Sequence, residues 1–184
     1  MSAIAKSRHR GLIVLGLLLL TLGVGALALP SIDDMGEVGI IEFELARTSE
    51  QASEYYGELG EEGRDAAEDS LYLDYPYLIL YGLFYAAACM VVAARAAERG
   101  MTRLAGWGRP LMWGSVAAAA CDAAENLALL RVLDGHTDQP WPGLAFTFAS
   151  VKFLLLTAAT LYIVVGFFLT WRASREPSGA PSPG

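Results

Sequence analysis

Long apolar runs constrain this chain more than any other feature of its sequence. Four of them, at residues 11–29, 71–94, 111–131 and 143–170, hold few charged residues, and the first holds none. A transmembrane helix needs about 20 predominantly apolar residues, so each run is long enough to cross a bilayer. Composition agrees, since 54% of the residues are hydrophobic and the mean hydropathy is +0.40. The sequence therefore predicts an all-α membrane protein, a four-transmembrane-helix antiparallel bundle.

Basic and acidic residues fall in different parts of the chain. Of the 13 lysines and arginines, nine lie in the N-terminal tail, the connection at 95–109 and the C-terminal tail: Lys6, Arg8, Arg10, Arg95, Arg99, Arg103, Arg109, Arg172 and Arg175. Because cytoplasmic loops are enriched in Lys and Arg, we expect these regions, and both termini, on the cytoplasmic side of an inner (plasma) membrane that the chain crosses several times. Most acids lie between Asp33 and Asp69. They predict an acidic extracytoplasmic face and, with a net charge of −7, argue against nucleic-acid binding.

These patterns define an expected topology. In order, we expect a basic cytoplasmic tail (1–10), a transmembrane helix (11–29), a small acidic extracytoplasmic cap of helical or irregular structure (30–70), a second helix (71–94), a basic cytoplasmic loop (95–110), a third helix (111–131), an outer turn (132–142), a fourth helix (143–170) and a disordered cytoplasmic tail (171–184). As an alternative, residues 1–28 could be a cleaved signal, because Ala26-Leu27-Ala28 resembles a cleavage site. The uncharged run exceeds the usual signal core, so a retained helix is preferred.

The acidic segment contains the pattern of a helix start. Thr48, followed three residues later by Gln51, fits a capping box, and glycines between 57 and 63 are expected to break the short helix that follows. Ahead of it, residues 40–45 alternate apolar and acidic side chains, which fits a strand or a segment lying on the membrane surface. We interpret the acids as a solvated face, because no loop here has the ligand spacing of a known calcium motif.

A polar stripe interrupts the third apolar run. Residues three and four apart share a helical face, so Asp122, Glu125 and Asn126 lie on one side of the predicted helix. Charged groups inside a bilayer are costly, and they mark functional sites or tight pairs. Lys152 of the fourth run is expected roughly 13 Å from the outer end of its helix and Asp122 roughly 15 Å from the outer end of its own, so the two should pair.

Asp74 lies near the start of the second run, among tyrosines typical of a membrane interface. It has two interpretations. It could be the N-cap of a helix whose first turn contains Pro76, since Asp suits that position and Pro suits the next ones. It could instead be a functional carboxylate at the level of the polar stripe.

Two interpretations of the intramembrane polar groups remain open. They could be structural contacts, in which polar side chains hold the third and fourth helices together. They could also line a hydrated pocket that opens to the extracytoplasmic side or the outer leaflet, under residues 37–70. The pocket interpretation is favoured. A structural ion pair with Lys152 needs one carboxyl group, whereas this region contains three carboxyl groups and an amide. The expected ligand-binding residues are Asp74, Asp122, Glu125, Asn126, Lys152, Tyr72, Tyr75 and Tyr81.

Several chemistries lack the residues that they need. The two histidines, His9 and His136, lie outside the apolar runs on opposite sides, so neither haem nor a buried His/Cys zinc site is expected. No GxSxG, HExxH or phosphate-binding glycine loop occurs, and we expect no cofactor and no metal. In helix number and intramembrane acids the chain is similar to emopamil-binding proteins, a likeness of architecture that implies no activity. It lacks the motifs of lipoprotein signal peptidases and the paired cysteines of vitamin K epoxide reductases.

Three functions follow from this sequence. The leading hypothesis is a membrane protein that binds a small amphipathic, lipid-like or cationic ligand in the acidic pocket. The second is a non-catalytic accessory or assembly subunit of a larger membrane complex, with another membrane protein as its partner. The third is a membrane lipid-modifying enzyme that uses Asp122 or Glu125 as general acid or base. Membrane lipids are expected partners in all three.

Overall fold

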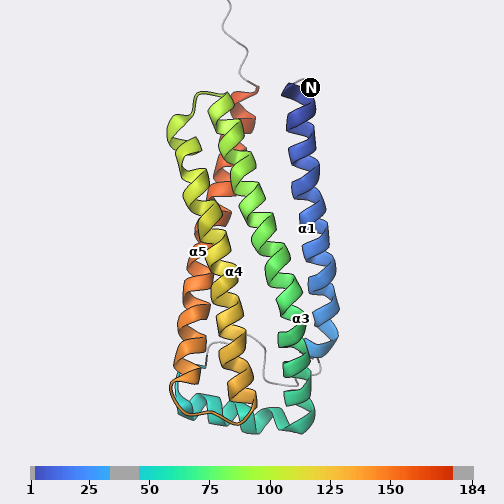
Figure 1. Cartoon of the computed structure of the whole chain (residues 1–184), viewed down its shortest axis with the longest axis vertical. Coiled ribbons are helices and arrows are strands. Elements are labelled where there is room, and N and C mark those ends of the chain that lie inside the picture. The colour runs from blue at the N-terminus through green and yellow to red at the C-terminus, as the bar shows by residue number, and fades with distance from the viewer. Residues whose placement is uncertain (1–2, 34–45, 176–184) are drawn as a thin grey trace, which may run out of the picture.

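The computed structural model describes residues 3–33 and 46–175, and its regular structure is helical (Figure 1). Within these ranges there are four helices and no strand: α1 (Ala3–Asp33), α3 (Ser49–Glu98), α4 (Thr102–Leu133) and α5 (Trp141–Ala173). Three of them, α1, α3 and α5, are long and apolar enough to cross a membrane. The predicted all-helical fold is confirmed. α4 is not among these three helices, because Asp122, Glu125 and Asn126 lower its mean hydropathy.

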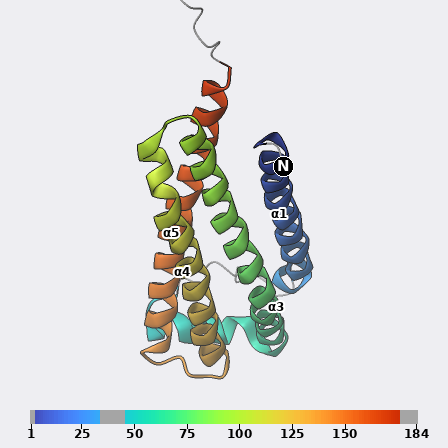
Figure 2. The same cartoon turned by 45° about the horizontal axis from the view of Figure 1, so that its top comes forward.

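The helices lie side by side, with α3 between α1 and the α4–α5 pair (Figures 1 and 2). The connection between α4 and α5 lies at one end of the molecule, together with the first part of α3 (Figure 1). We call this the cap end. The turn at residues 99–101, which joins α3 to α4, lies at the opposite end, which we call the turn end.

The first part of α3 begins at the capping box that the sequence predicts. The amide of Gln51 donates to Oγ1 of Thr48 at 3.2 Å, and Oε1 of Gln51 accepts from the amide of Thr48 at 3.3 Å. Gly60 then adopts φ 64° and ψ −169°, a conformation that suits glycine. The helix changes direction there, so its first part runs across the ends of α4 and α5 and its second part runs along them (Figure 2).

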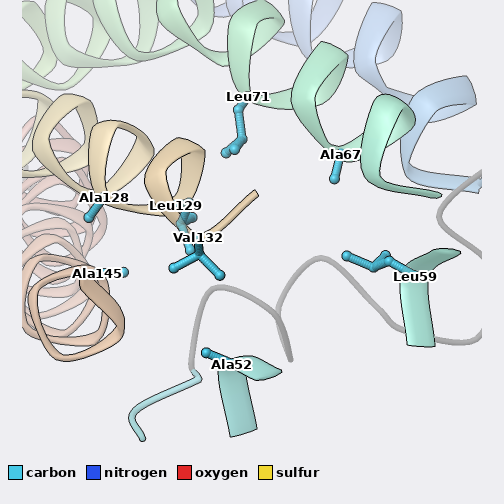
Figure 3. Close-up of a cluster of buried hydrophobic side chains, with 8 residues drawn as sticks. All are labelled: Ala52, Leu59, Ala67, Leu71, Ala128, Leu129, Val132 and Ala145. Atoms are coloured by element: carbon cyan, nitrogen blue, oxygen red, sulfur yellow. The ribbon is translucent and has the colours of Figure 1, made fainter. Parts of the chain in front are cut away.

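An apolar cluster holds this first part of α3 in place. Ala52 and Leu59 point toward Leu129 and Val132 of α4, and the cluster is completed by Ala67, Leu71, Ala128 and Ala145 (Figure 3). Side-chain hydrogen bonds add to it, since the hydroxyl of Ser53 donates to that of Thr137 at 2.9 Å. The first part of α3 thus covers the cap end of the bundle, and burial of this apolar surface stabilises its position.

The helices continue past the apolar runs on both sides. α3 is already helical ten residues before Asp74, and it continues through Pro76 to Glu98. The interpretation of Asp74 as an N-cap is therefore wrong: the residues before it are good helix formers, and its carboxylate caps no helix start. The predicted basic loop at 95–110 is mostly helical, which leaves a turn of three residues at 99–101.

Glycines allow the helices to approach closely near the turn end. A Cβ at Gly108 of α4 would overlap that of Ala93 of α3, and one at Gly166 of α5 would overlap Val92. A second apolar cluster, of Cys89, Val92, Ala159 and Tyr162, packs at this level. Small residues at such crossings bring the backbones together.

Two sequence predictions fall outside the described residues. These are the strand or surface segment at 40–45 and residues 176–184 of the disordered tail predicted at 171–184. The start of that tail was predicted wrongly, because residues 171–173 are helical and belong to α5.

Candidate functional site

An ion-pair cluster lies between α4 and α5. The ammonium of Lys152 is 2.7 Å from Oδ1 of Asp122 and 2.8 Å from Oε2 of Glu125. The side chains of all three are nearly inaccessible, with exposed fractions of 8%, 5% and 0%. The predicted contact between Asp122 and Lys152 is confirmed, and Glu125 shares the same cation. Charges this deeply buried are stable only when paired.

Two hydrogen bonds extend the cluster to α3. The hydroxyl of Tyr81 donates to Oδ2 of Asp122 at 2.6 Å, so both carboxylate oxygens of Asp122 have a donor. The amide of Asn126 donates to Oδ2 of Asp74 at 2.7 Å. Tyr81 and Asn126 are buried, and Asp74 is half-buried. One polar assembly thus joins three helices.

Helical periodicity explains how the chain brings these groups together. Asp122, Glu125 and Asn126 lie on one face of α4, and that face is turned inward. On α3, Asp74, Tyr77, Tyr81 and Tyr85 recur every three or four residues and so share a face.

A cavity of about 460 Å³ lies against one side of this assembly. Its walls come from all four helices: Leu18, Thr21 and Leu22 of α1, Asp74, Tyr77, Tyr81, Phe84 and Tyr85 of α3, Asp122 of α4, and Lys152, Phe153 and Leu156 of α5. Ligand sites of this kind are concave, mostly apolar and marked by a few polar groups. The cavity has this composition, since Asp74, Asp122 and Lys152 line it together with leucine and aromatic side chains.

The cavity contains four of the residues that the sequence analysis selected and leaves out four others. Asp74, Tyr81, Asp122 and Lys152 line it. Glu125 and Asn126 lie behind this wall, where they support Lys152 and Asp74. Tyr72 is 55% exposed and Tyr75 is half-buried, and neither lines the cavity.

Sequence reasoning identified Tyr81 but missed the other aromatic residues of the wall. Tyr77 and Tyr85 share the spacing of Asp74 and Tyr81, so the periodicity of α3 could have identified them. The rings of Tyr77 and Tyr81 lie 5.5 Å apart, and those of Tyr81 and Tyr85 lie 6.4 Å apart. The leucines of α1 that line the cavity could not be identified in this way, because the membrane-length run of α1 is apolar on every side.

The cluster contains more acid than base. Three carboxyl groups, on Asp74, Asp122 and Glu125, lie near one ammonium group, so the ionised cluster has a formal charge of −2. Phe153 faces the ammonium of Lys152 at 4.9 Å from its ring centroid. Among the described residues, no group of three or more His, Cys, Asp or Glu side chains could hold a metal ion.

Comparison with protein-family models, with curated proteins and with solved structures found no match to this chain. The site must therefore be interpreted from its own geometry.

Proposed function

We propose that this chain is a multi-pass membrane protein whose acidic cavity binds a small amphipathic ligand with a positively charged head. The observation that supports it best is that Asp74, Asp122 and Lys152 line one cavity whose other side chains are mainly aliphatic and aromatic. The excess of carboxylates over ammonium groups favours a cation. Leucine and phenylalanine side chains favour a ligand with an apolar part.

The aromatic wall supports the same head-group chemistry. The faces of Tyr and Phe rings attract cations, and aromatic cages with nearby carboxylates bind quaternary ammonium groups. Tyr77, Tyr81 and Tyr85 line the cavity next to Asp74 and Asp122. A methylated ammonium head would meet both kinds of group at once.

The proposed membrane orientation follows from the charges at the two ends. Arg95, Arg99 and Arg103 lie at or near the turn end, and the exposed acids Glu50 and Glu54 lie at the cap end. Under the positive-inside rule, the turn end is cytoplasmic and the cap end extracytoplasmic. In this orientation all four helices cross an inner (plasma) membrane as an antiparallel bundle, and the acidic cavity opens in the outer half.

The other functions stay predictions, because no specific observation favours them. Glu125, a candidate acid or base of the lipid-modifying enzyme, lies outside the cavity lining. The small residues of α4 do not favour an accessory subunit, because Ser115 and Ala118 are buried within this chain while Ala117 and Ala120 are exposed.

Ligand-dependent thermal stabilisation tests the proposal. The protein is reconstituted in lipid nanodiscs, and unfolding is followed with dodecyltrimethylammonium, dodecanol or dodecanoate, which share a chain and differ in charge. We expect only the cation to raise the unfolding temperature in a saturable manner. Asp74→Asn, which keeps the shape of the side chain, should weaken this stabilisation, because it removes a carboxylate that lines the cavity.

The matched control is Asp138→Asn, which removes an exposed carboxylate in the connection between α4 and α5. It should leave stabilisation by the cation unchanged. Equal stabilisation by all three probes, or an unchanged response of Asp74→Asn, would refute the proposed function.

A further inference from the structure

An apolar hollow lies on the exposed side of α5, near the turn end. It has a volume of about 390 Å³ and is lined by Ile163, Val164, Phe167, Phe168 and Trp171. Apart from the half-buried Ile163, these side chains are exposed, with exposed fractions from 45% to 61%. The hollow shares no residue with the acidic cavity, and the site described above does not use it. In the proposed membrane orientation its side chains meet the hydrocarbon of the bilayer.

Two arginines contact aromatic side chains that line the hollow. The guanidinium carbon of Arg95, on α3, lies 5.0 Å from the ring centroid of Phe167. That of Arg175, which follows the end of α5, lies 4.0 Å from the ring centroid of Trp171. Arginine stacks on aromatic rings and also binds phosphate oxygens through its N–H groups. Because each arginine contacts a lining residue directly, the apolar surface and the positive charge are contiguous.

A third arginine connects these two. Arg99, just after the end of α3, donates from Nη1 to the carbonyl oxygen of Arg95 at 3.0 Å and from Nη2 to the hydroxyl of Ser174 at 3.2 Å. The ends of α3 and α5 lie beside each other at the turn end (Figure 1). The neighbouring acid, Glu98, pairs with Arg10 of α1 at 3.5 Å. Within residues 3–33 and 46–175, none of the three arginines forms an ion pair with a carboxylate, so their N–H groups can serve an anion.

We propose that this surface binds an anionic phospholipid, whose phosphate contacts the three arginines and one of whose acyl chains lies in the hollow. Charge complementarity selects the head group: a lipid with a net negative charge offsets the guanidinium groups, whereas a zwitterionic lipid brings an ammonium group beside them. The contiguous apolar hollow selects a lipid over free phosphate. Under the positive-inside rule the turn end lies at the leaflet whose anionic lipids attract juxtamembrane arginines. The inference rests on the membrane placement in the proposed function and is independent of what the acidic cavity binds.

Fluorescence quenching by brominated lipids tests the site, because Trp171 lines the hollow. The full-length protein is reconstituted in nanodiscs of phosphatidylcholine, and phosphatidylglycerol or phosphatidylcholine with brominated acyl chains is added at the same low mole fraction. We expect brominated phosphatidylglycerol to quench more strongly, since the site concentrates it around Trp171. Trp171→Phe, which keeps an aromatic ring, should abolish this difference, because Trp107, Trp113 and Trp141 lie outside the hollow.

Arginine variants test the contribution of the head group. Arg95→Gln combined with Arg175→Gln should lower the apparent affinity for phosphatidylglycerol about tenfold, because two positive charges near the lipid head are lost. Arg175 follows the end of α5, so Arg175→Gln alone leaves every helix intact and should give a smaller shift in the same direction. Arg103→Gln is the matched control: it removes an exposed arginine of α4 that does not line the hollow, and it should leave the difference between the two lipids unchanged.

Three outcomes would overturn the inference. Equal quenching by the two brominated lipids would mean that the hollow meets bulk lipid. An equal loss in Arg103→Gln would mean that the turn end attracts anionic lipids as a whole and holds no site. Competition by inorganic phosphate as strong as that by unlabelled phosphatidylglycerol would mean that the hollow adds nothing to binding.

Failure of this inference is distinguishable from failure of the proposed function. The combined Arg95→Gln and Arg175→Gln variant should keep its stabilisation by dodecyltrimethylammonium, since neither arginine lines the acidic cavity. Loss of that stabilisation together with lipid binding would trace both effects to a disturbed fold and would overturn the assignment of these arginines to a lipid head group.

Discussion

The ammonium of Lys152 on α5 lies 2.7 Å from a carboxylate oxygen of Asp122 on α4, and Glu125 approaches the same nitrogen at 2.8 Å. One cation therefore serves two carboxylates in a region that solvent hardly reaches. Asp122 is also the point where the ion pair meets the cavity, because it lines the wall and accepts from Tyr81. The packing of α4 on α5 and the electrostatics of the candidate site thus depend on the same side chains.

Replacing Lys152 with methionine should be strongly destabilising. Methionine matches the length of the chain but leaves Asp122 and Glu125 buried without their cation, and breaking a buried pair in this way costs about 3–5 kcal/mol. Unfolding in mixed detergent micelles, followed by circular dichroism, measures the loss. Arg131→Met is the control: it removes an exposed pair with Asp134 at 3.4 Å, which should cost about 1 kcal/mol or less. Similar losses for the two variants would contradict the assigned burial.

Tyr81→Phe should weaken the same assembly by a smaller amount. It removes the hydroxyl that donates to Asp122 at 2.6 Å, and a hydrogen bond to a charged group is worth about 1.5–3 kcal/mol. Tyr85→Phe is matched in chemistry, but its hydroxyl accepts from neutral Thr160 at 3.0 Å, so about 0.5–1.5 kcal/mol is expected. A double-mutant cycle with Asp122→Asn should give a coupling energy for Tyr81 and none for Tyr85. Equal coupling for both tyrosines would be evidence against this assignment.

The contact between Asp122 and Lys152 was predictable because two simple rules fix it. Helical periodicity groups Asp122 with Glu125 on one face, and the rise per residue sets the depth of Lys152. A lone cation and a group of acids at the same depth have few other partners in a membrane. That Glu125 shares the same ammonium group was not predictable, since that depends on rotation of α4 about its axis by a fraction of a turn.

The cavity itself could not be predicted from the sequence. Its α1 wall comes from a helix that is apolar on every side, so no pattern distinguishes Leu18 and Leu22 from the leucines that face outward. Of the three tyrosines that the sequence suggested, Tyr81 lines the cavity and Tyr72 and Tyr75 do not. Tyr77 and Tyr85, on the same face of α3 as Tyr81, complete the wall. The helical residues between Gly60 and the predicted helix start at 71 were also missed, because an Asp two residues before a Pro occurs both at helix starts and, as here, within a longer helix.

Gly60→Ala should destabilise the first part of α3. At φ 64° and ψ −169° a side chain is strained by about 1–3 kcal/mol, and this conformation produces the change in direction. Hydrogen exchange of residues 49–59 should therefore become faster than in the wild type. Gly57→Ala is the control, since Gly57 is helical with open space around its Cβ position, and there alanine should stabilise by about 0.5–1 kcal/mol. Unchanged exchange in Gly60→Ala would mean that the kink is not required.

Gly108→Ala tests the close contact of α3 and α4 at the turn end. The added methyl group would overlap Ala93 and lie 3.1 Å from the hydroxyl of Tyr162, so the helices must move apart at a cost of about 1–3 kcal/mol. Gly106→Ala, two residues earlier on the same helix, meets nothing within 4 Å and should be neutral or slightly stabilising. Thermal unfolding in nanodiscs compares the two. Because Tyr162 also donates to the carbonyl of Leu104 at 3.0 Å, a shift of α4 should weaken that bond as well. Equal stabilities of the two variants would show that α3 and α4 do not approach as closely as Gly108 requires.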